Sequence, residues 1–162
     1  MKEFIVEPLE SRHELSTLDS GVVTLDSWLR NSSMRAQKQG SARTKVLVRP
    51  GTPKVLGYYS IAPTSVERSA LPNPASAGLS SVPAYLLARL ALDRSLQGIG
   101  LGANLLSTAL ADIVKASHLV GGRLVVVDAV DDTALKFYEH YGFKRIGPSN
   151  RLYERISAIT GK

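Results

Sequence analysis

The first half of the chain alternates between short apolar runs typical of strands and one stripe of apolar residues at helical spacing. Residues 4–9, FIVEPL, have the composition of a short strand. Residues 24–40 show an amphipathic pattern that stops at Gly40, which predicts a helix. The runs at 45–48 and 54–62 flank the turn sequence RPGTP, so we predict a β-hairpin there. The apolar stripe of the predicted helix consists of Leu25, Trp28, Leu29 and Ala36.

A segment rich in proline, serine and alanine, residues 67–83, comes before the next apolar strand, AYLLARLAL at 84–92. Proline and small polar residues favour turns over regular structure. We therefore predict a long surface loop between two strands.

The second half of the chain alternates between glycine-bounded helices and β-branched strands. A glycine-rich turn at 97–102 precedes a helical stripe over 103–119. Residues 122–130, GRLVVVDAV, suit a buried strand, which we expect to run parallel to the strand before the helix. Residues 131–143 predict a short helix with carboxylates in its first turn and Gly142 at its end. Two last strands are predicted at 143–146 and 151–156.

The order of these elements indicates an α/β protein, with a mixed twisted sheet flanked by helices. The length of 162 residues suits one domain, so we predict a single domain over residues 1–162. The sequence has no cysteine, which excludes disulfides, thiolate metal sites and a cysteine nucleophile. The histidines lack the spacing of metal ligands, and we predict no metal site. They are His13, His118 and His140.

The charge balance makes polyanions candidate partners. Twenty Lys and Arg against 14 Asp and Glu give a net charge of +6 at pH 7. A basic protein without a nucleic-acid ligand fits this charge equally well. No apolar run reaches the roughly 18 residues of a membrane span, and acidic residues interrupt the start MKEFIVEPLE, so we expect a cytoplasmic protein. The candidate nucleic-acid contacts are Arg30, Arg35, Lys38, Arg43, Arg89 and Arg94.

The glycine-rich turn QGIGLG at 97–102 is the strongest chemical signal in the sequence. Glycines allow the main chain to approach a ligand closely, and the following helix start presents unpaired N–H groups to an anion. A phosphate group suits such a turn, although glycines also serve tight turns that bind nothing. A Walker A loop would continue with Lys and Ser or Thr, whereas this turn continues with Ala103. A dinucleotide-binding turn would come earlier in its fold.

The run LARLALDRSLQGIGLG, followed later by DDTALKFYEHYGF, resembles the GNAT acetyltransferase family. Gln97, Gly100 and Gly102 match the family pattern Gln/Arg-x-x-Gly-x-Gly/Ala. The resemblance implies the GNAT fold and acetyl-CoA as co-substrate, with main-chain amides of the turn around the diphosphate and strand residues beside the pantetheine arm. The cofactor-binding residues that it implies are Leu90, Ala91, Leu92, Gln97, Gly98, Ile99, Gly100, Leu101, Gly102, Ala103, Asp132, Phe137 and Tyr138.

The second motif of this resemblance covers the predicted helix at 131–143 and ends in Gly142-Phe143. It implies that Tyr138 is the tyrosine beside the cofactor sulfur and the catalytic residue. Taken alone, Phe137, Tyr138 and Tyr141 would also suit an aromatic core stripe. The alanine of the family pattern falls on Ala134 or Leu135.

Nearly the whole chain, including LDSGVVTLDSWLRNSSMRAQKQGSARTKVLV, resembles acetyltransferase toxins of bacterial toxin–antitoxin modules. This resemblance implies acetylation of the α-amino group of aminoacyl-tRNA and a block of translation. It also implies a ribbon-helix-helix antitoxin as partner and a homodimer. Three positions depart from the pattern: Ile99 and Ala103 replace frequent basic residues, and Lys45 replaces a frequent tyrosine. These departures affect side-chain contacts to phosphate but not main-chain contacts.

Proton affinities favour an α-amine as acceptor over a lysine. An α-amino group titrates near about 7.7–8.0 and a lysine near about 10.4, so the α-amine needs less help from a general base. Tyr138 can protonate the leaving thiolate, and the N–H of Leu92 is the candidate oxyanion donor. Two alternatives stay open: a GNAT enzyme for a protein N-terminus, a lysine or a small-molecule amine, and a non-catalytic binding module that retains the turn.

Overall fold

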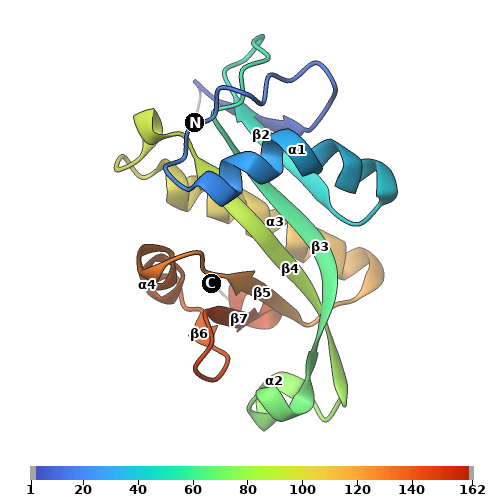
Figure 1. Cartoon of the computed structure of the whole chain (residues 1–162). Coiled ribbons are helices and arrows are strands. Elements are labelled where there is room, and N and C mark those ends of the chain that lie inside the picture. Colours follow the sequence, from blue (N-terminus) through green and yellow to red (C-terminus); the bar gives the residue numbers. More distant parts are fainter. Residues whose placement is uncertain (1–2, 161–162) are drawn as a thin grey trace. The chain divides into compact units, whose positions relative to one another are not determined.

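A computed structural model describes residues 3–160 of the chain (Figure 1). They form two compact units: the described residues up to Ala62 with Arg89–Ala109, and Pro63–Ala88 with the residues from Leu110 onward. The single domain over 1–162 stays a prediction. The strands are β1 (Ile5–Pro8), β2 (Arg43–Val48), β3 (Gly57–Glu67), β4 (Ser81–Leu92), β5 (Leu124–Asp128), β6 (Lys144–Arg145) and β7 (Arg151–Arg155). The helices are α1 (Val23–Gln39), α2 (Asn73–Ser76), α3 (Leu101–Val120), α4 (Asp132–His140) and α5 (Ile156–Thr160), with 3₁₀ turns η1 (Arg68–Ala70) and η2 (Arg94–Leu96).

The first unit contains β1, β2, the beginning of β3 and the end of β4, while the rest of β3 and β4 belongs to the second unit. The strand order here is β1-β2-β3-β4, and both β1 and β3 pair antiparallel with β2. The register places Ile5 opposite Val48 and Val46 opposite Tyr58. The Tyr58 hydroxyl donates a hydrogen bond to the Leu25 carbonyl at 2.7 Å, which ties β3 to the first turn of α1. The predicted first strand and the predicted hairpin are confirmed.

Helix α1 covers one face of the strands of this unit (Figure 1) and buries the apolar stripe that the sequence predicts. Leu25 and Leu29 are buried, and the Trp28 ring stacks on the Tyr58 ring with centroids 6.1 Å apart. The helix ends at Gly40, which adopts the left-handed conformation at φ 74° and donates its N–H to the last turn. The predicted helix and its glycine stop are therefore confirmed.

The strands of the second unit have the order β4-β5-β7-β6, with β4 and β5 parallel and the other pairs antiparallel. Leu124 and Val126 of β5 are completely buried and pack against Val82 and Tyr153. The β-branched run thus forms the buried parallel strand that the sequence predicts, and the α/β class is confirmed.

The segment 67–83 connects two strands on the surface, as predicted, but it contains more regular structure than the predicted loop. Strand β3 continues to Glu67 and β4 begins at Ser81, with η1 and α2 between them. A proline occupies the first turn of α2, where a missing N–H costs nothing. Leu71 and Ala75 are buried in the cluster that contains Val82. The predicted surface connection between two strands is confirmed, since most of these residues are exposed, but η1, α2 and the buried apolar side chains were not predicted.

Several element boundaries differ from the predicted ones by a few residues. Helix α3 begins at Leu101, two residues before the predicted start at Ala103. The residues from Lys54 to Leu56 lie outside β3. Helix α5 was not predicted, because its five residues are too few to show a helical period. Within residues 3–160, no helix is both long and apolar enough to cross a membrane.

Candidate active site

The end of β4 approaches β3 so closely that the facing position must be glycine. A Cβ on Gly57 would lie 2.9 Å from the Ala91 carbonyl oxygen and 3.2 Å from the Leu92 side chain. Just beyond, the Asp93 N–H donates to the Leu56 carbonyl at 2.8 Å. The last residues of β4, which the family resemblance places beside the pantetheine arm of acetyl-CoA, are therefore held firmly against β3.

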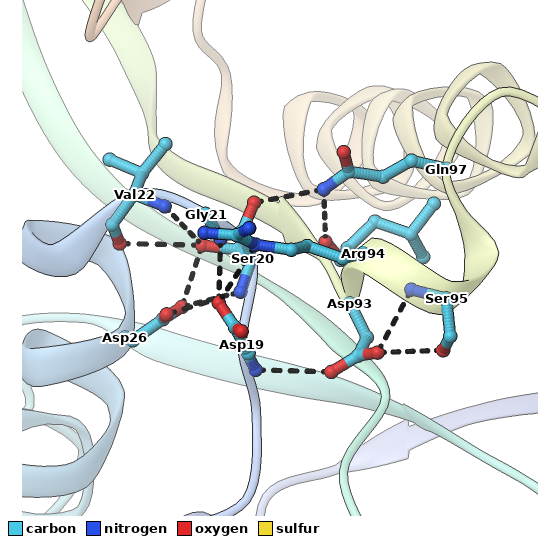
Figure 2. Close-up of polar contacts among 10 residues, drawn as sticks. Asp19, Ser20, Gly21, Val22, Asp26, Asp93, Arg94, Ser95 and Gln97 are labelled. Carbon is cyan, nitrogen blue, oxygen red and sulfur yellow. Dashed lines mark hydrogen bonds and ion pairs between the residues drawn. The ribbon is translucent and has the colours of Figure 1, made fainter.

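Asp93 caps the η2 turn that connects β4 to the glycine residues (Figure 2). Its carboxylate accepts hydrogen bonds from the Ser95 N–H at 3.1 Å, the Ser95 hydroxyl at 2.6 Å and the Asp19 N–H at 3.0 Å. Burial alone would raise the pKa of Asp93, but these hydrogen bonds outweigh it and hold the pKa below its ordinary value. The ionised carboxylate thus joins the turn to the segment that precedes α1.

The Gln97 side chain holds the other end of the η2 turn. Its Nε2 donates to the Leu92 carbonyl at 2.8 Å and to the Ser20 carbonyl at 2.9 Å (Figure 2). The Gln97 main-chain N–H donates to the Arg94 carbonyl at 3.2 Å. All N–H donors of Gln97 are therefore used within the protein, and the residues after it offer the donors that can reach a ligand.

The two glycines after Gln97 adopt a conformation that other residues rarely take. Gly98 has φ 81° and Gly100 has φ 87°. A Cβ at either position would meet no atom within 4 Å, so packing does not require glycine there. Ile99 lies between them with 68% of its surface exposed. The turn is consequently an open stretch of main chain with left-handed geometry, which is typical of anion-binding concavities.

Helix α3 starts directly from this turn and adds the positive end of its dipole. The Asn104 N–H donates to the Gly100 carbonyl at 3.3 Å in the first turn of the helix. The N–H groups of Leu101, Gly102 and Ala103 come before it and therefore have no acceptor within the helix. The first turn of α3 carries no acidic residue that would repel an anion. Taken with the open glycines, these donors fit a diphosphate group.

Tyr138 lies on α4 in the second unit, with its ring held by aromatic neighbours. The helix is capped by Asp131, whose carboxylate accepts the Ala134 N–H at 2.8 Å. The Tyr138 ring is edge-to-face with Phe137 at 5.4 Å and with Phe143 at 5.7 Å between centroids. The side chain is only 6% exposed. The residues of the aromatic core stripe and of the cofactor motif are thus the same. Tyr138 can be part of the core and also serve as the tyrosine beside the cofactor.

The Tyr138 hydroxyl stays protonated at physiological pH. Burial raises the pKa of Tyr138 well above its ordinary value, and the nearby negative charge of Asp128 adds to this effect. A neutral phenol of this kind can donate a proton to a ligand that reaches its hydroxyl.

The other residues that the sequence assigns to the cofactor in this unit lie on α4. Asp132 is exposed in the first turn, where the capping residue is its neighbour Asp131. Phe137 is half-buried and contacts both Tyr138 and Tyr141, the latter at 5.2 Å between ring centroids. These residues share one helix with the tyrosine, whereas the glycine turn belongs to the first unit.

The basic residues that the sequence assigns to nucleic acid all lie in the first unit. Arg89 places its guanidinium 4.2 Å from the centre of the Trp28 ring, and Arg94 pairs with Asp19 at 3.2 Å. These two cations therefore have partners within the protein. Arg94 is nevertheless exposed, as are Arg30, Arg35 and Lys38 on α1 and Arg43 at the start of β2.

The histidines are dispersed rather than grouped. His13 is buried, accepts the Glu10 N–H at Nδ1 at 2.9 Å, and contacts the Glu7 carboxylate through Nε2 at 2.8 Å. The accepting Nδ1 fixes the proton on Nε2, so both ring nitrogens are used. His118 and His140 are exposed. Among the described residues, no group of three His, Cys, Asp or Glu side chains could hold a metal ion.

Sequence reasoning missed the residues that support the glycine turn. An aspartate followed two positions later by serine, as in Asp93 and Ser95, is a typical start of a helical turn and could have been found. The contribution of Asp19 and Ser20 has no such signal, because they lie more than 70 residues away along the chain.

Comparison with known proteins gives this arrangement a family. The pattern of the family described as "Acetyltransferase (GNAT) domain" matches residues 76–156, which include the glycine turn and Tyr138. A protein of Mycobacterium tuberculosis named "tRNA-acetylating toxin" is 36% identical over 141 residues, which cover 86% of this chain and 83% of that protein.

Solved structures agree with the sequence match. The structure described as "AtaT complexed with acetyl-methionyl-tRNAfMet" has a TM-score of 0.89 at 30% identity and covers 97% of each chain. A tyrosine-to-phenylalanine mutant of AtaT, bound to the C-terminus of the antitoxin AtaR and acetyl-CoA, has a TM-score of 0.83 at 31% identity and covers 97% of this chain and 96% of that one. The predicted fold is confirmed, and the chain belongs to the GNAT acetyltransferase family.

Proposed function

We propose that this protein is a toxin that transfers the acetyl group of acetyl-CoA to the α-amino group of an aminoacyl-tRNA and thereby blocks translation. The observation that carries the proposal is the 36% identity, over 86% of the chain, to a relative named as a tRNA-acetylating toxin. The structure of AtaT with acetyl-methionyl-tRNAfMet supports the same class of acceptor.

The glycine turn is the part of the chain that we assign to the diphosphate of acetyl-CoA. Its open, left-handed main chain at Gly98 and Gly100 and the acid-free start of α3 suit two adjacent phosphates. Ile99 carries no charge, so main-chain N–H groups supply the contacts. The main chain of residues 90–92 is assigned to the pantetheine arm, and Asp132 and Phe137 of α4 to the same cofactor.

Tyr138 is the group that we assign to proton transfer. Bound acetyl-CoA supplies an activated thioester, whose cleavage releases a thiolate that must be protonated. A phenol whose pKa is raised by burial stays neutral at physiological pH, and its hydroxyl can donate to that sulfur. An α-amine needs little help to lose its own proton, since it titrates near about 7.7–8.0. No histidine is required as a base.

The exposed cations of α1 are the candidate surface for the tRNA phosphates. Replacing Arg30, Arg35 and Lys38 together with glutamine is expected to weaken binding of an uncleavable aminoacyl-tRNA analogue about tenfold or more, because each lost phosphate contact removes counterion release. The slope of log K against log salt should fall by about 0.7–0.9 for each contact that is lost. Filter binding at several salt concentrations measures both effects.

The control for this experiment removes the same charge elsewhere. Replacing Lys115, Lys136 and Lys144, which are exposed in the second unit, with glutamine lowers the net charge by the same three units. This triple variant should keep the salt slope of the wild type. Equal slopes for all three proteins would remove α1 from the proposed tRNA surface.

The proposed partners follow from the same relatives. AtaT is described in complex with the C-terminus of the antitoxin AtaR, which supports a cognate antitoxin for this chain. We assign to that antitoxin the ribbon-helix-helix class, to this protein a homodimeric state, and to both the cytoplasm. Size-exclusion chromatography with light scattering tests the dimer directly.

The reaction itself is tested by incubating the protein with labelled acetyl-CoA and a mixture of charged tRNAs. Label is expected on the aminoacyl moiety, released by mild base together with the amino acid, and absent from uncharged tRNA. Peptides with a free N-terminus, peptides with lysine and small amines serve as competing acceptors. Label that enters only those acceptors would establish the alternative GNAT activity, and no transfer to any acceptor would favour a non-catalytic binding module.

A further inference from the structure

Two segments that are distant in sequence are joined at the glycine turn. The segment 19–21 precedes α1, and the segment 93–97 precedes the glycines; both belong to the first unit. The Arg94 N–H donates to the Asp19 carbonyl at 2.8 Å, and the Arg94 Nε donates to the Asp19 carboxylate at 3.2 Å. The Asp19 N–H donates in return to Asp93. The start of α1 and the start of the cofactor turn are therefore held as one piece (Figure 2).

Ser20 links these hydrogen bonds to the first turn of α1. Its carbonyl accepts the Gln97 side chain at 2.9 Å, while its N–H and hydroxyl donate to the Asp26 carboxylate at 3.1 and 2.6 Å. Asp26 is buried in the first turn of α1. A continuous path of hydrogen bonds therefore runs from Gln97 through Ser20 to Asp26.

We infer that Gln97 is a positioning residue whose side chain sets the glycine turn and couples its occupancy to the start of α1. One carboxamide nitrogen spans the end of β4, at Leu92, and the segment before α1, at Ser20. Because Gly98 and Gly100 have no side chain to restrain them, Gln97 is the last side-chain anchor before the open main chain. The inference rests on the proposed assignment of the diphosphate to this turn.

This inference predicts that binding of the cofactor and ordering of the start of α1, the helix proposed to contact tRNA, affect each other. A ligand that fixes the turn also fixes the Gln97–Ser20–Asp26 path, so coenzyme A should slow hydrogen exchange at the main-chain N–H groups of residues 19–26. By reciprocity, a ligand that orders the start of α1 should tighten coenzyme A by the same factor.

The test compares Gln97→Leu with a matched variant, Gln37→Leu. Gln37 is another glutamine of the first unit whose side chain bridges two main-chain groups, the Leu9 carbonyl at 2.8 Å and the Thr44 N–H at 3.1 Å. Gln97→Leu is expected to raise the Kd for coenzyme A and the KM for acetyl-CoA about tenfold with kcat within about twofold, because the loss falls on binding. Gln37→Leu should lower Tm and leave Kd and KM unchanged.

Hydrogen exchange supplies a reading that a general loss of stability cannot imitate. Coenzyme A is expected to protect residues 19–26 in the wild type and in Gln37→Leu, but not in Gln97→Leu at saturating ligand. If the leucine variant fails to fold, Gln97→Glu provides a second test. The ionised carboxylate of this variant cannot donate a hydrogen bond to the Leu92 or Ser20 carbonyl, whereas a protonated carboxyl group can donate one. Its deficit in affinity should therefore shrink as the pH falls from about 8 to about 5.

The outcomes separate this inference from the assignment on which it rests. Gly100→Val in the same binding assay reports on the diphosphate site itself. If Gly100→Val weakens coenzyme A binding while Gln97→Leu keeps wild-type affinity and protection, the inference is overturned and the assignment of the site stands. If neither variant changes the affinity, both are overturned.

Discussion

Replacing Tyr138 with phenylalanine is expected to lower kcat by roughly 10²- to 10⁴-fold while the affinity for coenzyme A stays within about twofold of the wild type. Phenylalanine keeps the ring that packs edge-to-face on Phe137 and Phe143 and removes only the hydroxyl. The lost group is the proton donor to the leaving thiolate, so the effect should fall on the chemical step. Calorimetry with coenzyme A and steady-state kinetics separate the two quantities.

The pH dependence of the wild-type rate is part of the same prediction. Burial raises the pKa of Tyr138 above its ordinary value, which keeps the donor protonated over the whole physiological range. The rate should therefore show no loss from tyrosine ionisation below about pH 10, the ordinary value for this group. A descending limb near neutral pH that disappears in Tyr138→Phe would contradict a neutral donor.

A second tyrosine of the same helix provides the control for this substitution. Tyr141 is exposed at the C-terminal end of α4 and also contacts Phe137. Tyr141→Phe should keep kcat within about twofold of the wild type, since its hydroxyl is assigned no proton transfer. Equal rates for Tyr138→Phe and the wild type would remove Tyr138 from the mechanism.

The parts of the fold that follow from local sequence were predicted, and those that depend on distant contacts were not. The helix stop at Gly40 and the buried strand from Leu124 depend on neighbours in sequence, because a left-handed cap and a β-branched run are local properties. The burial of Leu71 depends on residues brought together only by the folded second unit. The local turn preference therefore indicated a surface connection but could not show which of its side chains are buried.

The same distinction holds within the candidate site. The open turn at Gly98 and Gly100 was predictable because a positive φ requires glycine, whatever the rest of the chain does. The use of the Gln97 donors was not predictable, because one of their acceptors, Ser20, lies 77 residues away. A family pattern marks Gln97 as important without saying whether its side chain contacts the ligand or the protein. The hydrogen bonds indicate that the Gln97 side chain contacts the protein.

Gly100→Val is expected to raise the Kd for coenzyme A by about 10²-fold. Gly100 has φ 87°, and holding a non-glycine residue there costs of order 1–3 kcal/mol, most for a β-branched side chain. The turn can relieve this strain only by rotating its main chain, which turns the N–H groups away from the diphosphate. No protein atom lies within 4 Å of the new Cβ, so the substitution leaves the core intact. Isothermal titration calorimetry on the folded variant measures the change.

Gly51 offers a control with the same backbone conformation and the same empty surroundings. It has φ 78°, meets no atom within 4 Å of a built Cβ, and lies in the turn between β2 and β3 of the first unit. Gly51→Val should lower Tm by an amount similar to Gly100→Val, because both variants strain one left-handed residue on the surface. It should bind coenzyme A like the wild type. A loss of affinity shared by both variants would show that strain anywhere in the unit weakens binding, whereas a loss confined to Gly100→Val ties the diphosphate to the main chain of this turn.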